Sequence, residues 1–153
     1  MAELKVGRKA PQFSLPGDPA RTLADLAGSP VVVFFYPQDD TETCTIEATD
    51  FSALSSEFGK LGAIVVGISP DSAESHAKFT RKYGLKQLLV PDTDLKLAKA
   101  YGVWAEKTLF GRTYMGIVRT TFLIGRDGKI ARIWPKVRVK DHAKQVLAAV
   151  KAL

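Results

Sequence analysis

The stretch that decides the fold is Val31-Val-Val-Phe-Phe-Tyr-Pro-Gln-Asp-Asp-Thr-Glu-Thr-Cys-Thr-Ile-Glu47, and it holds the only cysteine of the chain, Cys44. Its first half is a β-branched and aromatic run that stops at Pro37, which predicts a buried strand followed by a polar turn. An amphipathic pattern begins near Cys44, so we expect the thiol in the first turn of a helix. Because helix N-termini carry partial positive charge and unpaired N–H groups, they favour a thiolate over a thiol. A lone cysteine is otherwise most often a small buried hydrophobic residue, but the polar residues 39–43 predict an accessible turn.

Length and composition predict one soluble domain that spans residues 1–153. The hydrophobic share of 46% and the charged share of 25% are ordinary for a globular protein, and a chain of this size can bury a core without cross-links. One cysteine excludes an internal disulfide. The first residues contain no apolar leader, and no run approaches the roughly 18 apolar residues of a membrane span. The expected location is therefore the cytoplasm, without membrane contact.

The charge pattern argues against several classes of partner and cofactor. Net charge is +6, from 22 Lys and Arg against 16 Asp and Glu. No nucleic-acid-binding signature accompanies these residues, so we expect a solvated basic face and no nucleic-acid partner, while weak attraction to acidic proteins stays open. No glycine-rich phosphate loop is present, so no nucleotide or flavin cofactor is expected. His76 and His142 are far apart and lack other ligands at metal-binding spacing, so we expect no metal site and place His142 on the surface.

Hydrophobic periodicity predicts strands that alternate with helices. Expected strands cover residues 13–15, 31–36, 62–69 and 87–90, and a hairpin joins 117–124 to 129–134 around an Asp-Gly turn. Expected helices cover residues 23–28, 44–58, 73–83, 95–101 and 141–153. This order predicts an α/β fold with a mixed central sheet flanked by helices and an N-terminal extension. It is the thioredoxin-like order, in which a reactive thiol starts the helix after a central strand.

The motif Pro37-x-x-x-Thr41-x-x-Cys44 resembles the active-site signature of peroxiredoxins, which are thiol peroxidases on a thioredoxin-like fold. Further stretches are similar to the Q-type, or bacterioferritin-comigratory-protein, branch of that family: Phe35-Tyr-Pro-Gln-Asp-Asp-Thr41, Gly67-Ile-Ser-Pro-Asp71, Tyr101-Gly-Val-Trp104, Tyr114-Met-Gly-Ile-Val-Arg-Thr-Thr-Phe-Leu-Ile124 and Trp134-Pro-Lys-Val. The similarity covers nearly the whole chain in the same order. It implies a thiol-dependent peroxidase that reduces hydrogen peroxide and organic hydroperoxides.

The resemblance implies a role for each matched residue. Cys44 would attack the hydroperoxide, while its backbone N–H, the Thr41 hydroxyl and the Arg119 guanidinium stabilise the developing charge. Arg119 would also stabilise the thiolate, since an opposite charge within about 4–6 Å favours the charged form. Pro37 is expected to shield one side of the thiolate from water, and Glu47 to orient the arginine. The alternatives are a capping or turn threonine, a surface arginine at a strand edge and a solvent-facing helix glutamate.

The chain departs from the Q-type branch in its second thiol. The branch usually carries a resolving cysteine at the position of Thr49 or of Thr80, and often Pro-Gly where this chain has Glu42-Thr43. A one-cysteine member implies that a small thiol, a thioredoxin- or glutaredoxin-like protein or another copy of the chain reduces the Cys44 sulfenate. A monomer or weak homodimer is expected. A non-catalytic redox sensor or chaperone-like binding protein, switched by oxidation of Cys44, is the alternative function.

Overall fold

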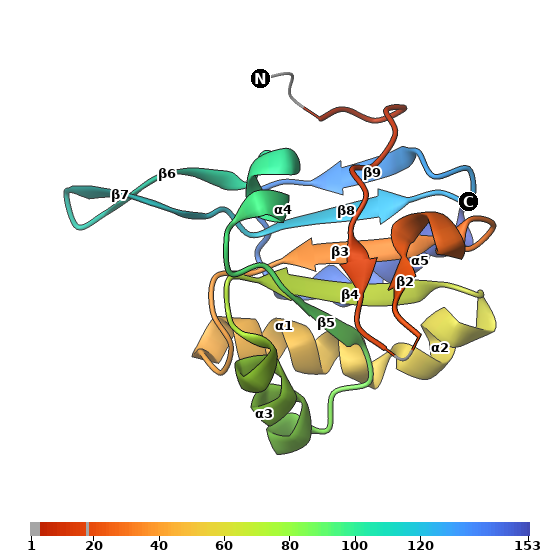
Figure 1. Ribbon diagram of the computed structural model, residues 1–153, viewed down its shortest axis with the longest axis horizontal. Coiled ribbons are helices and arrows are strands. Elements are labelled where there is room, and N and C mark those ends of the chain that lie inside the picture. The colour runs from red at the N-terminus through yellow and green to blue at the C-terminus, as the bar shows by residue number, and fades with distance from the viewer. Residues whose placement is uncertain (1–3, 18) are drawn as a thin grey trace.

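The computed structural model describes residues 4–17 and 19–153, and its centre is a five-stranded mixed sheet (Figure 1). The strand order is β5-β4-β3-β8-β9. β3 pairs in parallel with β4, and β4 with β5, whereas β8 is antiparallel to both β3 and β9. The bounds are β3 Val31–Phe35, β4 Ile64–Ser69, β5 Leu88–Pro91, β8 Thr120–Ile124 and β9 Ile130–Trp134. The α/β fold with a mixed sheet, predicted from the sequence, is confirmed.

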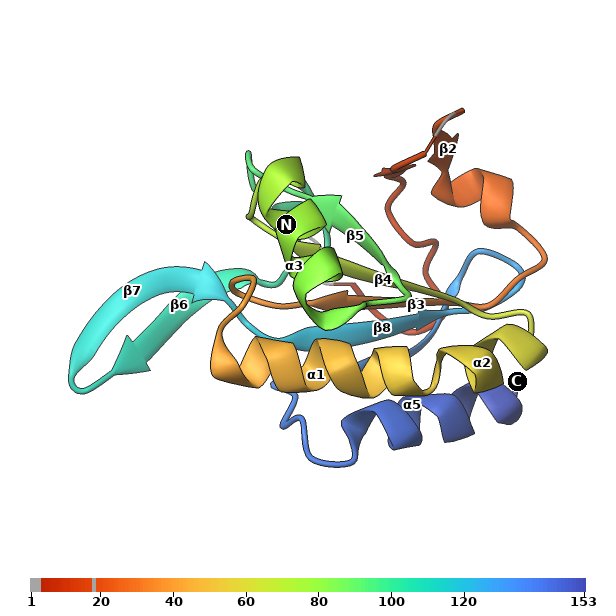
Figure 2. The same ribbon diagram turned by 90° about the horizontal axis from the view of Figure 1, so that it is seen from below.

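Helices and the N-terminal extension cover both faces of this sheet. One face carries α1 (Glu42–Ala53), α2 (Ser55–Lys60) and α5 (His142–Lys151), which Figure 2 shows side by side below the strands. The other face carries the short strands β1 and β2, the 3-10 helix η1 and α4, while α3 packs beside the edge strand β5. Their bounds are β1 Ser14–Leu15, β2 Arg21–Thr22, η1 Leu23–Leu26, α3 Ala73–Tyr83 and α4 Lys96–Ala100. None of the helices in the described ranges is long and apolar enough to cross a membrane.

β3 belongs to two hydrophobic cores because both of its faces are covered. Val31, Val33 and Phe35 pack in the core on the α4 side. Val32 and Phe34 pack in the core beneath α1 and α5. A strand buried on both faces needs an uninterrupted apolar run instead of an alternating one. This is why the strand could be assigned from the sequence.

The long helix expected over residues 44–58 is two helices. α1 begins at Glu42, two residues earlier than expected, and Leu54 separates it from α2 with φ −98° and ψ 8°. These angles lie in the bridge region, which is typical of turns and interrupts the regular helix. No glycine or proline marks the break, so periodicity alone did not reveal it. By contrast, α3 begins after the capping side chain of Ser72 and ends at Gly84, whose φ is 61°, as its sequence predicted.

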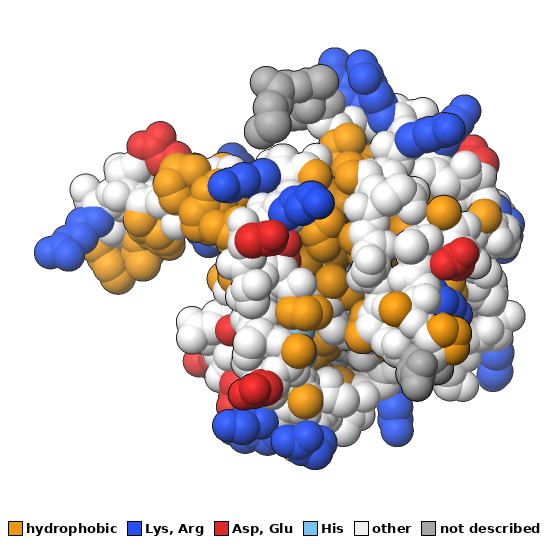
Figure 3. All heavy atoms as spheres, viewed as in Figure 1, with side chains coloured by type: hydrophobic (Ala, Val, Ile, Leu, Met, Phe, Trp, Pro, Cys, Tyr) orange, Lys and Arg blue, Asp and Glu red, His pale blue; other side chains and the backbone are white. Residues whose placement is uncertain are grey.

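A hairpin of β6 (Trp104–Leu109) and β7 (Arg112–Ile117) was not predicted. It projects from the body at the end where α1 begins (Figures 1 and 2). Its turn is Phe110-Gly111, and both residues have positive φ, 52° and 76°. Such turns are usually marked by Asn-Gly or Asp-Gly, so a phenylalanine in the first position concealed it. Figure 3 shows hydrophobic side chains along the hairpin, and its exposed large apolar residues are Leu109, Phe110, Tyr114 and Met115.

This hairpin divides the strand that was expected over residues 117–124. Ile117 ends β7, and β8 begins only at Thr120. Between them the Val118 N–H donates to the Val103 carbonyl, and the Arg119 carbonyl accepts from the Val137 N–H, each at 2.8 Å. The chain thus changes pairing partners at Arg119, which leaves this side chain at a junction and not within a strand.

Gly67 should not tolerate a side chain. It pairs with Phe34 on β3 and with Leu89 on β5, and a Cβ there would lie 2.7 Å from Phe34 Cζ and 2.9 Å from Leu89 Cδ2. We expect Gly67→Ala to lower the free energy of unfolding by about 1–3 kcal/mol, the usual cost of overpacking a core. Urea denaturation with an unchanged m-value measures this loss.

Gly59→Ala is the matched control. Nothing lies within 4 Å of a Cβ at Gly59 in α2, and alanine is the better helix former by about 1 kcal/mol. We therefore expect this variant to equal or exceed the wild type in stability. Similar losses at Gly59 and Gly67 would contradict the tight packing of β4 between its neighbours.

Candidate functional site

Cys44 lies at the start of α1, directly after the loop that leaves β3. Thr41 is the N-cap residue, which makes Cys44 the third residue of the helix. No side chain caps this helix end, so the partial positive charge of its N–H groups is not offset by a capping acceptor. The predicted position in the first turn is confirmed, but only 2% of Cys44 is exposed. The thiol is therefore less accessible than the polar turn before it suggested.

Arg119 reaches Cys44 from the junction between β7 and β8. Its Nη2 donates to Cys44 Sγ at 3.2 Å, and its Nη1 donates to Glu47 Oε1 at 2.7 Å. The antiparallel pairing of β3 with β8 brings this junction beside the loop after β3. The surface alternatives for Arg119 and Glu47 are wrong, because only 13% and 2% of these side chains are exposed.

Burial and mutual contact set the charges of Glu47 and Arg119. Burial raises the pKa of Glu47 to about 7, although Arg119 pulls it in the opposite direction. Only one Glu47 oxygen is bonded; Oε2 is buried without a partner among the described residues, which adds to the cost of its charge. For Arg119, burial disfavours the charge, but Glu47 and Cys44 outweigh this effect and raise its pKa. The guanidinium therefore stays charged, while the carboxylate titrates near neutrality.

Thr41 and Pro37 belong to the loop between β3 and α1. Thr41 Oγ1 donates to the Gln38 carbonyl at 3.0 Å, and the Thr41 carbonyl accepts from the Thr45 N–H at 2.8 Å. The hydroxyl therefore supports the turn and does not cap the helix. Pro37 is half-buried between the end of β3 and this turn. The structure thus places both residues in the loop that leads to Cys44.

Sequence reasoning missed a buried polar network in the same loop. Only 8% of Asp39 is exposed, although its neighbours predicted an accessible turn. Its carboxylate accepts hydrogen bonds from Tyr36 Oη at 2.7 Å, Ser75 Oγ at 2.8 Å and His76 Nδ1 at 2.7 Å. No local pattern could reveal the last two partners, because they lie 36 and 37 residues away in the chain.

Asp39, Asp71 and His76 hold ligand atoms within 4.8 Å of one another, a spacing that suits a metal ion. The geometry fits a hydrogen-bonded network better. Asp71 Oδ2 accepts from Ser69 Oγ at 2.6 Å and from the Asp39 N–H at 2.8 Å. Hydrogen-bond donors therefore already occupy acceptor sites that a cation would need.

The expected surface position of His142 is wrong. It is 3% exposed, and its Nε2 lies 2.8 Å from Thr121 Oγ1 on β8. Its ring meets the rings of Phe51 and Trp134 edge to face. Burial, and then the charge of Arg119, lowers the pKa of His142 to about 4, so the ring is neutral at pH 7. The buried face of α5 begins at His142. The apolar periodicity of the sequence becomes clear only one turn later.

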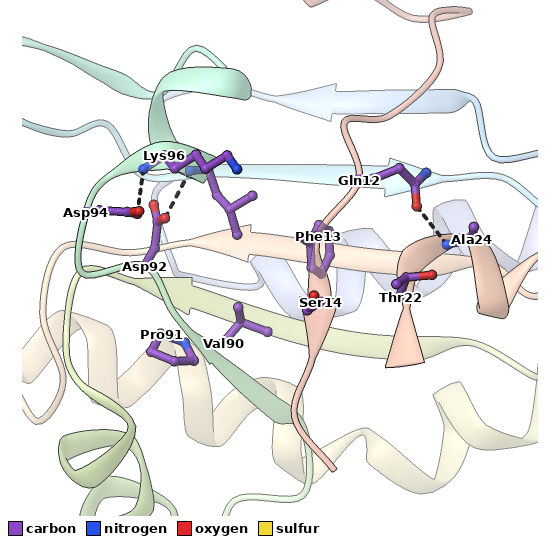
Figure 4. A pocket seen from close by; sticks show the side chains of 11 residues that line it. Gln12, Phe13, Ser14, Thr22, Ala24, Val90, Pro91, Asp92, Asp94 and Lys96 are labelled. Carbon is purple, nitrogen blue, oxygen red and sulfur yellow. Dashed lines mark hydrogen bonds between the residues drawn. The ribbon is translucent and has the colours of Figure 1, made fainter. Parts of the chain in front are cut away.

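A cavity of about 600 Å³ lies on the opposite side of the molecule, between the N-terminal extension and the β5–α4 segment (Figure 4). Two of its polar side chains, those of Asp92 and Gln12, bind backbone N–H groups. Asp92 accepts from the N–H groups of Leu97 and Ala98 at 2.9 and 2.8 Å, and Gln12 Oε1 accepts from the Ala24 N–H at 2.8 Å. The chemistry-bearing residues therefore gather around Cys44 and not in this cavity.

Comparison with known proteins gives one consistent likeness. Residues 6–133 match the AhpC/TSA family. Peroxiredoxin Bcp of Bacillus subtilis is 45% identical over 150 residues, which cover 97% of this chain and 96% of that protein. Xanthomonas campestris bacterioferritin comigratory protein, solved in a study of its alkyl peroxide reduction activity, superimposes with a TM-score of 0.87 and 41% identity, over 97% of this chain and 98% of that one.

Two solved mutants of Xanthomonas campestris peroxiredoxin Q bear on the missing thiol. Each carries serine in place of a different cysteine, and each superimposes with a TM-score of 0.87 and 42% identity over 97% of this chain and 96% of its own. Their two mutated cysteines are as far apart along that chain as Cys44 and Thr80 are along this one. This spacing agrees with a second cysteine position at Thr80.

His142 should couple stability to pH. Its pKa of about 4 in the folded chain compares with about 6.5 when unfolded, so the unfolded chain binds the extra proton between these values. The contribution of the neutral His142 ring to the free energy of unfolding is therefore complete above about pH 6.5, and it is lost as the pH falls towards 4. We expect the stability advantage of the wild type over His142→Gln to shrink by roughly 2 kcal/mol between pH 7 and pH 4.5, measured by urea denaturation.

Glu47 has the opposite linkage, because its pKa is raised: its contribution is present below about pH 4.5 and is lost as the pH rises through about 7. Both proteins keep Glu47, so its effect cancels in the comparison. A wild-type advantage that is constant or grows on acidification would contradict a buried neutral His142.

Proposed function

Because the chain belongs to the AhpC/TSA family, we propose that it is a thiol peroxidase that reduces hydrogen peroxide and organic hydroperoxides with Cys44 as its nucleophile. The observation that carries this proposal is the 3.2 Å contact between Arg119 Nη2 and Cys44 Sγ at the start of a helix. The thiolate is the reactive form of a cysteine, and the guanidinium and the helix N–H groups beside this sulfur are the groups that favour negative charge.

The reaction transfers one oxygen atom to sulfur. The Cys44 thiolate attacks the outer oxygen of a hydroperoxide, and the S–O bond forms as the O–O bond breaks. The outer oxygen brings its hydrogen, so Cys44 becomes a sulfenic acid, while the departing alkoxide or hydroxide takes a proton from solvent. Sulfur is oxidised and the peroxide is reduced. Because negative charge moves from sulfur to the leaving oxygen, Arg119 is placed to stabilise it at both stages.

The other site residues support this transfer. Glu47 binds one Nη atom of Arg119, which directs the other Nη atom at sulfur. The Thr41 hydroxyl was expected to donate to the developing charge, but its hydrogen is given to the Gln38 carbonyl. Its oxygen is therefore placed to accept a hydrogen bond from the O–H of the peroxide instead. Pro37 has no N–H and limits the water that can hydrogen-bond beside the loop.

The sulfenic acid must be reduced by a thiol from outside the chain. Cys44 is the only cysteine, and threonine stands at positions 49 and 80. A first external thiol displaces the oxygen as water and leaves a mixed disulfide on Cys44; a second thiol releases the reduced enzyme. A small thiol or a thioredoxin- or glutaredoxin-like protein can supply both.

We propose that residues 1–153 act as one catalytic unit, a monomer or weak homodimer with an antioxidant role in the cytoplasm. The guanidinium that contacts the Cys44 sulfur belongs to the same chain, which supports a site built within one subunit. The absent second thiol favours a redox sensor as the competing function, because a sensor needs oxidation of Cys44 but not turnover.

Cys44→Ser should abolish thiol-dependent peroxide consumption and leave the fold intact. The change replaces sulfur with oxygen at similar volume, but a serine hydroxyl is not ionised at neutral pH. Consumption of hydroperoxide with added dithiothreitol or thioredoxin measures turnover, and mass spectrometry of the wild type should show one added oxygen after one equivalent of peroxide. Wild-type protein that oxidises once and does not turn over with any thiol would favour the sensor, and an active serine variant would remove Cys44 from the mechanism.

Arg119→Lys should slow oxidation of Cys44 by about 10²–10³-fold, the scale of removing one oriented donor from a charge-stabilising site. Lysine keeps the charge but cannot contact Glu47 and sulfur through two fixed N–H directions. Stopped-flow oxidation by hydrogen peroxide measures the rate. Arg112→Lys, on the exposed β7 strand, is the matched control and should match the wild type. Equal rates for the two variants would exclude Arg119 from the site.

A further inference from the structure

Two aspartates of the loop between β3 and α1 are bound by α3. Asp39 accepts from Ser75 Oγ and His76 Nδ1, both on α3, at 2.8 and 2.7 Å. Asp40 accepts from Lys82 Nζ and Tyr83 Oη, on the following turns of the same helix, at 2.7 and 2.5 Å. The two sets differ in environment, because the side chains of Asp39 and His76 are each 4% exposed, whereas those of Asp40 and Lys82 are 41% and 59% exposed. Only the contacts of Asp39 are shielded from solvent. These contacts therefore contribute most of the stability of the attachment between the loop and α3.

The Asp39 set is fully satisfied. His76 Nδ1 faces Asp39 Oδ2, and its Nε2 lies 3.1 Å from the Val90 carbonyl. Both ring nitrogens thus lie within hydrogen-bond distance of an acceptor oxygen. Tyr36 Oη, at the end of β3, donates to the other Asp39 oxygen at 2.7 Å. The carboxylate is therefore bound from β3 on one side and from α3 on the other.

This attachment lies immediately before the nucleophile. Asp40 adopts φ 58° directly after Asp39, and the chain then passes through the N-cap Thr41, whose hydroxyl binds back to Gln38. The third residue of the helix is Cys44. With so few residues between them, a displacement of Asp39 moves the first turn of α1, whereas Arg119 is fixed separately by the β7–β8 junction.

We propose that Asp39, with His76 as its principal partner, is a positioning anchor that holds the first turn of α1 so that the Cys44 sulfur stays against Arg119. This inference rests on the proposed peroxidase function and goes beyond it, because it assigns the alignment of the nucleophile to residues that do not touch it. A misplacement of about 1 Å in a reacting group can cost about 10²-fold in rate. The anchor therefore has a kinetic consequence although it contributes no reacting atom.

Asp39→Asn and His76→Gln test the anchor with two probes of the same sulfur. Oxidation by hydrogen peroxide requires alignment with Arg119. Alkylation by iodoacetamide requires the thiolate and access to it, so it is measured above the ordinary thiol pKa of about 8.5, where its rate follows the exposure of the sulfur; only 2% of Cys44 is exposed. We expect each variant to oxidise about 10–100-fold more slowly and to be alkylated several-fold faster. Hydrogen exchange at the amides of residues 41–45 should accelerate. The double variant should be no slower than the slower single variant, because both changes break one contact.

Two aspartates provide matched controls. Asp40→Asn changes the neighbouring, exposed carboxylate, and asparagine tolerates its positive φ. Asp92→Asn weakens a buried carboxylate that binds the start of α4, on the side of the sheet away from Cys44. Both controls should keep wild-type oxidation and alkylation rates per folded molecule, although Asp92→Asn should lower the unfolding free energy.

The outcomes separate the anchor from general destabilisation and from the function itself. Oxidation and alkylation that change in opposite directions in Asp39→Asn support the anchor. Rates like those of Asp40→Asn, or losses that only follow the folded fraction as in Asp92→Asn, overturn it. If Asp39→Asn does not fold, His76→Gln alone decides by the same criteria. If the wild type has no peroxidase turnover, alkylation and hydrogen exchange still report whether α3 holds the first turn.

Discussion

The antiparallel pairing of β3 with β8 is the constraint on which the site depends. In this register Phe35, the last residue of β3, lies opposite Thr120, the first residue of β8. The loop that leaves β3 and the junction that enters β8 therefore meet at the same end of the sheet. Cys44 and Arg119 lie 75 residues apart in the chain, and no local structure could join them. The contact between Arg119 and the Cys44 sulfur therefore follows from this one strand pairing.

The buried charges around Cys44 compensate one another. A buried charge is costly unless it is paired and hydrogen-bonded. Arg119 meets this condition with two partners, the sulfur and Glu47, and the neutral ring of His142 behind it adds no second positive charge. In the proposed reaction the sulfur carries no charge after oxidation, and Glu47 is then the anion that remains beside Arg119. The titration of Glu47 near neutrality therefore matters most in the oxidised enzyme, where Arg119 has no other anion.

The parts of the molecule that could be predicted are those with a local signal. The uninterrupted apolar runs predicted β3 and β4, and Ser72 and Gly84 predicted the ends of α3. The resemblance to the family motif pointed to Cys44, Arg119 and Glu47 as site residues. The β6–β7 hairpin was not predicted because Phe110 occupies a turn position that usually holds asparagine or aspartate. The contact between Asp39 and His76 was not predicted because the two residues are far apart in the sequence. His142 was misplaced because a histidine at a helix start does not reveal which way it faces.

The wide separation of Cys44 and Arg119 also affects how the protein is made. A ribosome releases the chain from its N-terminus, so α1 can form long before the segment that carries Arg119 emerges. Closing so long a loop costs entropy and is slow relative to local helix formation. Until β8 joins β3, the thiol has no guanidinium beside it. In the proposed mechanism, the charge stabilisation that Arg119 gives the sulfur thus arises only with completion of the sheet.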